Sequence, residues 1–193
     1  MLRKFYHLGG LFFVAAALYI SPAAAKTACG IMLGIIIGVD VLRLNISSFN
    51  NWLFSAFPGL FKEKERNSFS GSPYFLGGVL LSLVLFDVKF ASCGIVILCF
   101  GDSSASLIGS RIGRIRIADK SLEGSIAFII AATLFVYILT LIAPEVKGLS
   151  GIPLKNIFTA SAVCALLELI PAKYIDDNLV IPVAGSFILK LLN

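Results

Sequence analysis

Seven apolar stretches alternate with polar segments along the 193 residues, and this alternation constrains the fold more than any other feature. The stretches are 8–20, 27–42, 74–86, 90–100, 124–143, 157–170 and 179–192. Hydrophobic residues make up 58% of the chain and charged residues 14%, whereas soluble proteins have about half and about a quarter. A globular core cannot bury this surplus, so the lipid bilayer is the expected solvent.

Backbone groups inside lipid must be satisfied within their own segment, and none of the stretches has the alternating pattern of a membrane strand. We therefore predict an all-α, polytopic membrane helical bundle of about seven transmembrane helices, forming one integral-membrane domain over residues 1–193. Several stretches are shorter than the about 20 residues that a straight span needs. Stretch 90–100 is expected to continue through 105–107, and a re-entrant hairpin over 74–100 is the alternative.

Two further patterns predict packing inside the bundle. Gly30, Gly34 and Gly38 recur at four-residue spacing, which places them on one helix face and predicts close contact with a neighbouring helix. The four cysteines stand in apolar stretches without the spacing of metal ligands. We expect them to be small, buried packing residues.

The charged residues are divided unequally between the two sides of a seven-span chain. Eleven of the sixteen basic residues fall on the side of the N-terminus and of segments 43–73, 101–123 and 171–178. The positive-inside rule therefore predicts a cytoplasmic N-terminus, and it explains the net charge of +5 without a nucleic-acid partner. Nine of the eleven acidic residues lie on the same side, several at span ends, which predicts a polar site at the cytoplasmic face.

The N-terminal segment has two interpretations. Arg3 and Lys4, the apolar stretch 8–20 and the small residues at 21–25 have the layout of a cleavable signal peptide. Cleavage would remove Arg3, Lys4 and His7 from the charged face, so we favour a retained first span. No Arg- and Ser-rich transit segment precedes this span, which predicts the cytoplasmic membrane of a bacterium or an archaeon.

Residues 46–61 form neither a clean span nor a polar loop. Aromatic residues, including the single tryptophan Trp52, alternate there with serine and asparagine. This pattern predicts a segment at the membrane interface, acting either as an anchor or as a gate for a lipid substrate.

The strongest candidate site lies in residues 100–125. Gly101 and Asp102 end an apolar stretch, and small residues, further glycines and basic residues follow. Glycines let backbone N–H groups approach phosphate oxygens, basic side chains neutralise phosphate charge, and carboxylates hold a bridging divalent cation. Together these features predict a metal-bound phosphate ligand without a Walker loop, although each glycine by itself fits helix packing equally well.

The order of the motifs resembles that of the CTP-dependent lipid-alcohol kinases, which include dolichol kinase, phytol kinase and CTP-dependent diacylglycerol kinase. The resemblance covers nearly the whole chain and rests on Arg3-Lys4-x-x-His7, Lys62-Glu63-Lys64-Glu65 with Ser70-Gly71, Tyr74-Phe75 with Gly77, Gly101-Asp102-x-x-Ala105-x-x-x-Gly109-x-x-x-Gly113, Lys120-Ser121-x-Glu123-Gly124-Ser125, and Asp177-Asn178-Leu179 with Pro182. It implies transfer of the γ-phosphate of CTP to a membrane lipid alcohol, with Mg²⁺ or another divalent cation. The alcohol would be a polyprenol, phytol or diacylglycerol.

The resemblance also implies roles for individual residues. Asp102, Lys120 and His7 are the candidate catalytic residues, and Asp102 either binds the metal or accepts the proton of the hydroxyl group. The candidate metal ligands are Asp102, Glu123 and Asp177, with Asp176 as an alternative. The candidate nucleotide-binding residues are Arg3, Lys4, Gly101, Ser103, Gly109, Gly113, Lys120, Ser121, Gly124 and Ser125.

Three further charged residues lie outside this set. Glu168, near the end of an apolar stretch, is expected to pair with a cation on a neighbouring span. Asp40 and Arg43 end the second stretch, where they form either a local ion pair or a part of the site.

Two alternative functions remain open at this point. Phosphatidate cytidylyltransferases share the nucleotide signature, but they end in a Lys-Asp…His-Gly-Gly…Asp-Arg signature, and this chain has no histidine after His7. A small transporter would place charges near the bilayer midplane and often shows repeated halves, whereas here the charges gather on one face. We therefore favour the kinase.

Overall fold

The computed structural model describes residues 7–59, 61, 63–117, 120–144, 148–169 and 176–193. Helices make up most of these residues, and one short antiparallel hairpin pairs Arg116 with Ser121 and Ile117 with Lys120. The elements are η1 (His7–Gly9), α2 (Gly10–Ala15), the π-helical turn η2 (Ala16–Ile20), α3 (Pro22–Asn45), α4 (Ser47–Ala56), η3 (Glu63–Glu65), α5 (Gly71–Leu85), α6 (Val88–Ile112), β1 (Arg116–Ile117), β2 (Lys120–Ser121), α7 (Leu122–Ile142), η4 (Leu149–Gly151), α8 (Leu154–Leu169) and α9 (Asp177–Leu192).

Over its described residues, each of the seven predicted apolar stretches coincides with one helix or with consecutive helical segments, to within one residue at the ends. Three of these helices (α3, α6 and α7) are by themselves long and apolar enough to cross a membrane, and His7–Ile20 and Gly71–Leu85 are shorter apolar helices. Helix α6 runs to Ile112, so its predicted continuation past 105–107 is confirmed. The chain is thus an all-α membrane protein.

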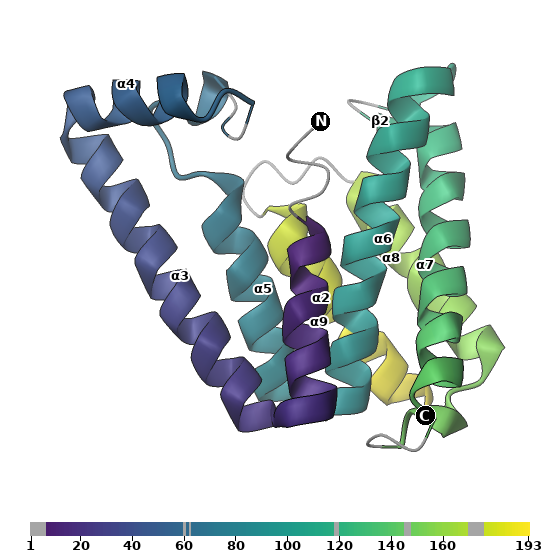
Figure 1. The fold of residues 1–193 in the computed structure, drawn as a ribbon. Helices are drawn as coiled ribbons and strands as arrows, with labels where there is room; N and C mark the ends of the chain where they lie inside the picture. Colours follow the sequence, from purple (N-terminus) through teal and green to yellow (C-terminus); the bar gives the residue numbers. More distant parts are fainter. Residues whose placement is uncertain (1–6, 60, 62, 118–119, 145–147, 170–175) are drawn as a thin grey trace.

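Consecutive long helices run in alternating directions, so their ends gather at two opposite ends of the bundle (Figure 1). One end holds the starts of η1, α5, α7 and α9 and the last turns of α3, α6 and α8. We call it the charged end, because most of the acidic and basic residues in the described part of the chain lie in these segments or in the loops and the hairpin that join them. The opposite end holds the turn between α5 and α6 and the C-terminus of α9.

Helix α6 lies in the middle of the bundle and buries an almost continuous run from Phe90 to Cys99. A Cβ atom on Gly94 would collide with Ser186 and with the carbonyl oxygen of Pro182, both on α9. Two helical turns further along α6, a Cβ atom on Gly101 would lie 2.6 Å from the Phe128 ring of α7. The absence of a side chain at these positions therefore lets α6 approach two neighbours closely.

The glycines predicted to approach a nucleotide continue this contact between α6 and α7. A Cβ atom on Gly109 would lie 2.6 Å from Ser121 Oγ, one on Gly113 would lie 2.7 Å from the same oxygen, and one on Gly124 would lie 3.0 Å from the carbonyl oxygen of Ala105. Ser121 also caps α7, since its Oγ accepts a hydrogen bond of 3.1 Å from Gly124 N–H. These residues thus have a packing role, and their contact with a nucleotide stays a prediction.

The glycine row of α3 behaves in the opposite way. A Cβ atom on Gly30, Gly34 or Gly38 would have nothing within 4 Å in the described chain. The prediction that this row contacts a neighbouring helix is therefore wrong for the described residues. Helix α3 instead packs on α5 through another face, where the Sγ of Cys29 donates to the carbonyl oxygen of Leu76.

The four cysteines are free and buried, as predicted.

A buried ion pair closes the charged end of α3. Arg43 Nε donates to Asp40 Oδ1 at 2.5 Å, and its other nitrogens donate to the carbonyl oxygens of Glu65 and Ser68. The second Asp40 oxygen accepts from both the N–H and the Oγ of Ser70. The predicted local ion pair is confirmed, and it fastens the segment before α5 to the end of α3.

Helix α4 follows this end of α3 and lies across it (Figure 1). Trp52 on α4 leaves 57% of its surface exposed and stacks on Phe49, with the ring centroids 5.8 Å apart. Exposed aromatic rings beside apolar helices are typical of a segment at the membrane interface.

The packing role of Gly109 predicts a stability effect that depends on Ser121. In Gly109→Ala the new methyl group displaces Ser121 Oγ from its capping position, so the free energy of unfolding falls by about 1–2 kcal/mol. In the Ser121→Ala background the same substitution costs little, because the remaining neighbours would lie at 3.6 Å and 3.8 Å. The free energies of unfolding in detergent of wild type, Gly109→Ala, Ser121→Ala and Gly109→Ala/Ser121→Ala measure how far the cost of the Gly109 substitution depends on Ser121.

Gly34→Ala is the matched control for this cycle. It adds a methyl group to a helical glycine with nothing within 4 Å, so stability should stay the same or rise by up to about 1 kcal/mol. Equal losses from Gly109→Ala in both backgrounds would contradict the packing role.

Candidate active site

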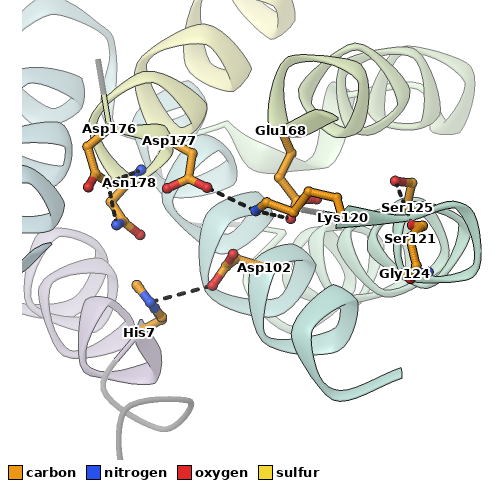
Figure 2. Close-up of polar contacts among 10 residues, drawn as sticks. All are labelled: His7, Asp102, Lys120, Ser121, Gly124, Ser125, Glu168, Asp176, Asp177 and Asn178. Atoms are coloured by element: carbon orange, nitrogen blue, oxygen red, sulfur yellow. Dashed lines mark hydrogen bonds and ion pairs between the residues drawn. The ribbon is translucent and has the colours of Figure 1, made fainter. Parts of the chain in front are cut away.

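His7 and Asp102 meet where the first helical segment packs on the middle of the bundle. His7 Nε2 lies 3.5 Å from Asp102 Oδ2 (Figure 2). The histidine is held at two other points: the Cys99 Sγ donates to its carbonyl oxygen at 2.8 Å, and its ring meets the Phe75 ring edge-on at 5.2 Å. Cys99 and Asp102 are three residues apart on α6 and therefore share one face of that helix. The position of His7 beside Asp102 thus follows from its contacts with α5 and α6.

Lys120 connects three further elements. It lies in β2, and its Nζ donates to Glu168 Oε1 on α8 at 2.7 Å and to Asp177 Oδ2 on α9 at 3.1 Å (Figure 2). The prediction that Glu168 pairs with a cation is confirmed, although the cation belongs to the hairpin before α7 and not to a span. We call His7, Asp102, Lys120, Glu168 and Asp177 the charged cluster.

The electrostatics of the charged cluster keep Lys120 protonated. Burial by itself disfavours the charged ammonium group, but the carboxylates of Asp177 and Glu168, together with the more distant Asp102, outweigh this effect. They raise the pKa of Lys120 well above its ordinary value. The ammonium group is therefore a fixed positive charge among three carboxylates.

Asp176, next to the charged cluster, has a different environment. It caps α9, since its Oδ1 accepts from the backbone N–H and from the side-chain Nδ2 of Asn178. Burial and the neighbouring Asp177 carboxylate raise the pKa of Asp176 in spite of these hydrogen bonds. Asp176 thus has a capping role at the start of α9, the helix whose first residue is Asp177.

The hairpin that carries Lys120 is fastened to the first turn of α7. Glu123 Oε1 accepts from the backbone N–H groups of Arg114 and Ile115 at 2.9 Å and 3.3 Å, and Leu122 N–H donates to the carbonyl oxygen of Ile115. The predicted metal ligand Glu123 therefore binds the loop after α6. Figure 2 places Ser121, Gly124 and Ser125 on the side of Lys120 away from His7 and Asp102.

The predicted site residues thus fall into three groups. The structure brings together Asp102, Lys120, His7 and Asp177, and it places Ser103 on α6 directly after Asp102. Arg3 and Lys4 lie outside the described residues. The others, on the interface between α6 and α7, are Gly101, Gly109, Gly113, Ser121, Glu123, Gly124 and Ser125.

One member of the charged cluster was not predicted as a site residue. Sequence reasoning identified Glu168 only as a buried carboxylate with a cationic partner. The signal that could have placed it in the site is its position at the same end of the bundle as Asp102, because a carboxylate at that depth needs a cation from the polar segments there.

Comparisons with known proteins find relatives of this chain. An uncharacterised protein of Methanocaldococcus jannaschii is 36% identical over 132 residues, which cover 66% of this chain and 62% of the relative. The CTP-dependent diacylglycerol kinase 1 of Schizosaccharomyces pombe is 29% identical over 161 residues, which cover 79% of this chain and 74% of the kinase. A chloroplastic protein of Glycine max, named probable phytol kinase 1, is 27% identical over 201 residues, which cover 94% of this chain and 63% of the relative.

The match with the first of these relatives spans somewhat less than two thirds of its length. No protein-family model matches the chain, and no solved structure matches it. The related kinases are aligned over most of the chain, including the segment that carries Asp102 and Lys120 in the motif order described above. The chain is therefore similar, at 26–29% identity over most of its length, to CTP-dependent diacylglycerol kinases and to a probable phytol kinase, which supports the CTP-dependent lipid kinase family.

Proposed function

We propose that this protein phosphorylates the hydroxyl group of a membrane lipid alcohol, with CTP as the phosphate donor. The observation that carries the proposal is the charged cluster, in which five separate elements bring a His–Asp pair and a lysine between carboxylates to one end of an apolar bundle. A lipid alcohol has its hydroxyl group at the boundary between hydrocarbon and water. The names of the relatives indicate diacylglycerol or phytol as acceptors, and a polyprenol fits the same chemistry.

In the proposed reaction the hydroxyl oxygen of the lipid attacks the γ-phosphorus of CTP. A new P–O bond forms, the bond from the γ-phosphorus to the β–γ bridging oxygen breaks, and CDP leaves. Such transfers depend mainly on positioning and on charge neutralisation. Either Asp102 or His7, whose side chains lie 3.5 Å apart, accepts the single proton of the hydroxyl group, and Lys120 neutralises the phosphate oxygens.

A divalent cation is part of the proposal. No group of three His, Cys, Asp or Glu side chains in the described part of the chain could hold a metal ion. Mg²⁺, however, is usually held by one or two carboxylates together with substrate phosphates and water. Asp102 and Asp177, which both act on Lys120, fit that donor set, and the ion when bound would neutralise charge on the transferred phosphate. Glu123 already binds two backbone N–H groups and is the weaker candidate.

Arg3 and Lys4 complete the proposed nucleotide site. They stand four and three residues before His7 in the sequence, and His7 lies at the charged end of the bundle. The guanidinium group of Arg3 and the ammonium group of Lys4 would add to the positive charge of Lys120 and favour the binding of a triphosphate.

We further propose that all seven helical stretches cross the membrane, with the N-terminus in the cytoplasm. The alternating helix directions and the charges at one end support this arrangement. CTP is a cytoplasmic nucleotide, so its site and the charged end share that side. The cytoplasmic membrane of a bacterium or an archaeon is the proposed location, and the archaeal relative is compatible with it.

The function is tested with the purified chain in mixed micelles that contain Mg²⁺ and a panel of lipid alcohols. CTP is supplied in parallel with label on the γ-phosphate or on the cytidine. We expect only the γ-phosphate label to enter lipid, and Asp102→Asn to abolish this transfer while the protein stays folded. Ser55→Ala, an exposed hydroxyl on α4 that bonds its own helix, is the matched control and should retain full activity.

Three results would contradict the proposal. Cytidine label entering lipid, with phosphatidate supplied, would identify a cytidylyltransferase. Transfer of neither label would favour a transporter. Wild-type turnover by Asp102→Asn would remove Asp102 from the reaction.

The orientation predicts the location of both ends of the chain. A reporter fused after Asn193 should lie outside the cytoplasm, because an odd number of spans puts the two termini on opposite sides. A reporter in the loop between α4 and α5 should lie in the cytoplasm. A cytoplasmic reporter after Asn193 would mean that one of the seven helices does not cross, and the shorter α5 would be the first to examine.

A further inference from the structure

Glu168 carries the most deeply buried charge of the charged cluster. Its side chain is 2% exposed and lies in the last turn of α8. A carboxylate there loses its hydration and faces the negative end of the helix dipole, and both effects are unfavourable. The Lys120 ammonium group at 2.7 Å offsets these costs. A residue in so unfavourable a position calls for an explanation beyond packing.

The second carboxylate on Lys120 has a different setting. The Asp177 side chain is 32% exposed and lies 3.1 Å from Lys120 Nζ, and the lysine itself is 33% exposed. Lys120 thus has one sheltered and one accessible carboxylate partner. Figure 2 shows Asp177 and Asp102 on the side of the ammonium group that faces His7, while Glu168 reaches it from α8. An anion arriving from water meets Asp177 before it can meet Glu168.

We propose that Glu168 is the positioning residue for Lys120 and that Asp177 is the exchangeable partner. This inference rests on the proposed function. Glu168 holds the ammonium group beside Asp102 both without and with nucleotide, whereas a phosphate oxygen of CTP replaces Asp177 on Lys120. An ammonium group has three donor hydrogens, so it keeps the bond to Glu168 while it donates to a phosphate. The exchange releases an Asp177 oxygen for a cation that arrives with the nucleotide.

The different roles of Glu168 and Asp177 follow from their different solvent exposure and from the cost of leaving each carboxylate unpaired. A phosphate group cannot displace Glu168 without leaving a buried carboxylate unpaired, which is strongly unfavourable. Replacing Asp177 leaves a partly exposed carboxylate that water or a cation can stabilise. The phosphate of the nucleotide therefore replaces Asp177 on Lys120, because releasing Asp177 costs less free energy than releasing Glu168.

A purely structural ion pair predicts a different outcome. Buried ion pairs are often replaced by neutral side chains of similar size without loss of stability, and a structural pair would then leave the activity unchanged. A positioning role requires that Glu168 acts on the reaction through Lys120. The two interpretations separate in a double-mutant cycle.

The cycle compares wild type, Glu168→Gln, Lys120→Met and Glu168→Gln/Lys120→Met, each as the whole chain in mixed micelles. We expect Glu168→Gln to lower kcat/KM for CTP by about 10- to 100-fold, the range for loss of a hydrogen bond to a charged group. In the Lys120→Met background the same substitution should have no further effect. Losses that multiply in the double variant would show that Glu168 acts independently of Lys120, and would overturn the proposal.

Three controls keep the cycle interpretable. Lys120→Met by itself leaves the Glu168 carboxylate buried and unpaired, so it is the variant most prone to misfold. If Lys120→Met misfolds, the double variant Glu168→Gln/Lys120→Met, in which neither side chain is charged, serves as the reference without Lys120. Glu168→Asp, which keeps the charge one methylene further away, should then recover part of the activity lost in Glu168→Gln. Ser161→Ala, at a fully buried position two helical turns earlier on α8, should retain wild-type activity.

CTP binding without any lipid alcohol provides a readout that does not depend on turnover. Equilibrium binding of labelled CTP should weaken in Glu168→Gln, by about the same factor as kcat/KM if the loss lies in nucleotide binding. If wild type binds CTP but transfers no label, the proposed function fails, and the binding data still decide on Glu168. If wild type transfers label and Glu168→Gln matches it in both kcat/KM and CTP binding, only the present inference fails. If wild type neither binds nor transfers, both fail.

Discussion

The close approach of α6 to its neighbours is the constraint on which the rest of the structure depends. Gly94 brings its backbone against α9, and Gly101 and Gly109 bring it against the Phe128 ring and the cap of α7. Because α6 also carries Asp102, its position decides where the carboxylate lies relative to α2, α8 and α9. The same helix holds His7 through Cys99. A shift of α6 by the size of one methyl group would therefore move Asp102 relative to Lys120, Glu168 and Asp177.

The charged cluster is also shaped by its position at the end of an apolar bundle. Three carboxylates in one place repel each other, and the shortage of water at this depth makes the repulsion more costly. Lys120 balances part of this charge from a hairpin that is fastened to α7 through Glu123 and Leu122. The remaining negative charge suits a cation, and the accessible side of Lys120 suits a phosphate. Both are components of phosphoryl transfer from a nucleotide.

Much of the architecture could be predicted from the sequence because lipid permits few choices. Apolar stretches in a bilayer must be helical, and helices joined by short segments must alternate in direction. The gathering of Asp102, Lys120, His7 and Asp177 at one end follows from their positions at the polar edges of the stretches. The roles of the glycines could not be predicted in this way. Gly109 and Gly113 have the same four-residue spacing as Gly30, Gly34 and Gly38, yet among the described residues only Gly109 and Gly113 have a close neighbour.

The physical reason is that spacing determines which residues share a helix face, whereas a contact depends on what packs against that face. The sequence by itself determined the seven helices, their alternating directions and the end at which the charges lie. The tertiary structure alone decided that Lys120 meets Glu168 and Asp177, 48 and 57 residues further along the chain. It also decided that Glu123 holds the hairpin. Local periodicity has no information about partners so distant in the chain, because the packing of α6 against α7, α8 and α9 brings them together.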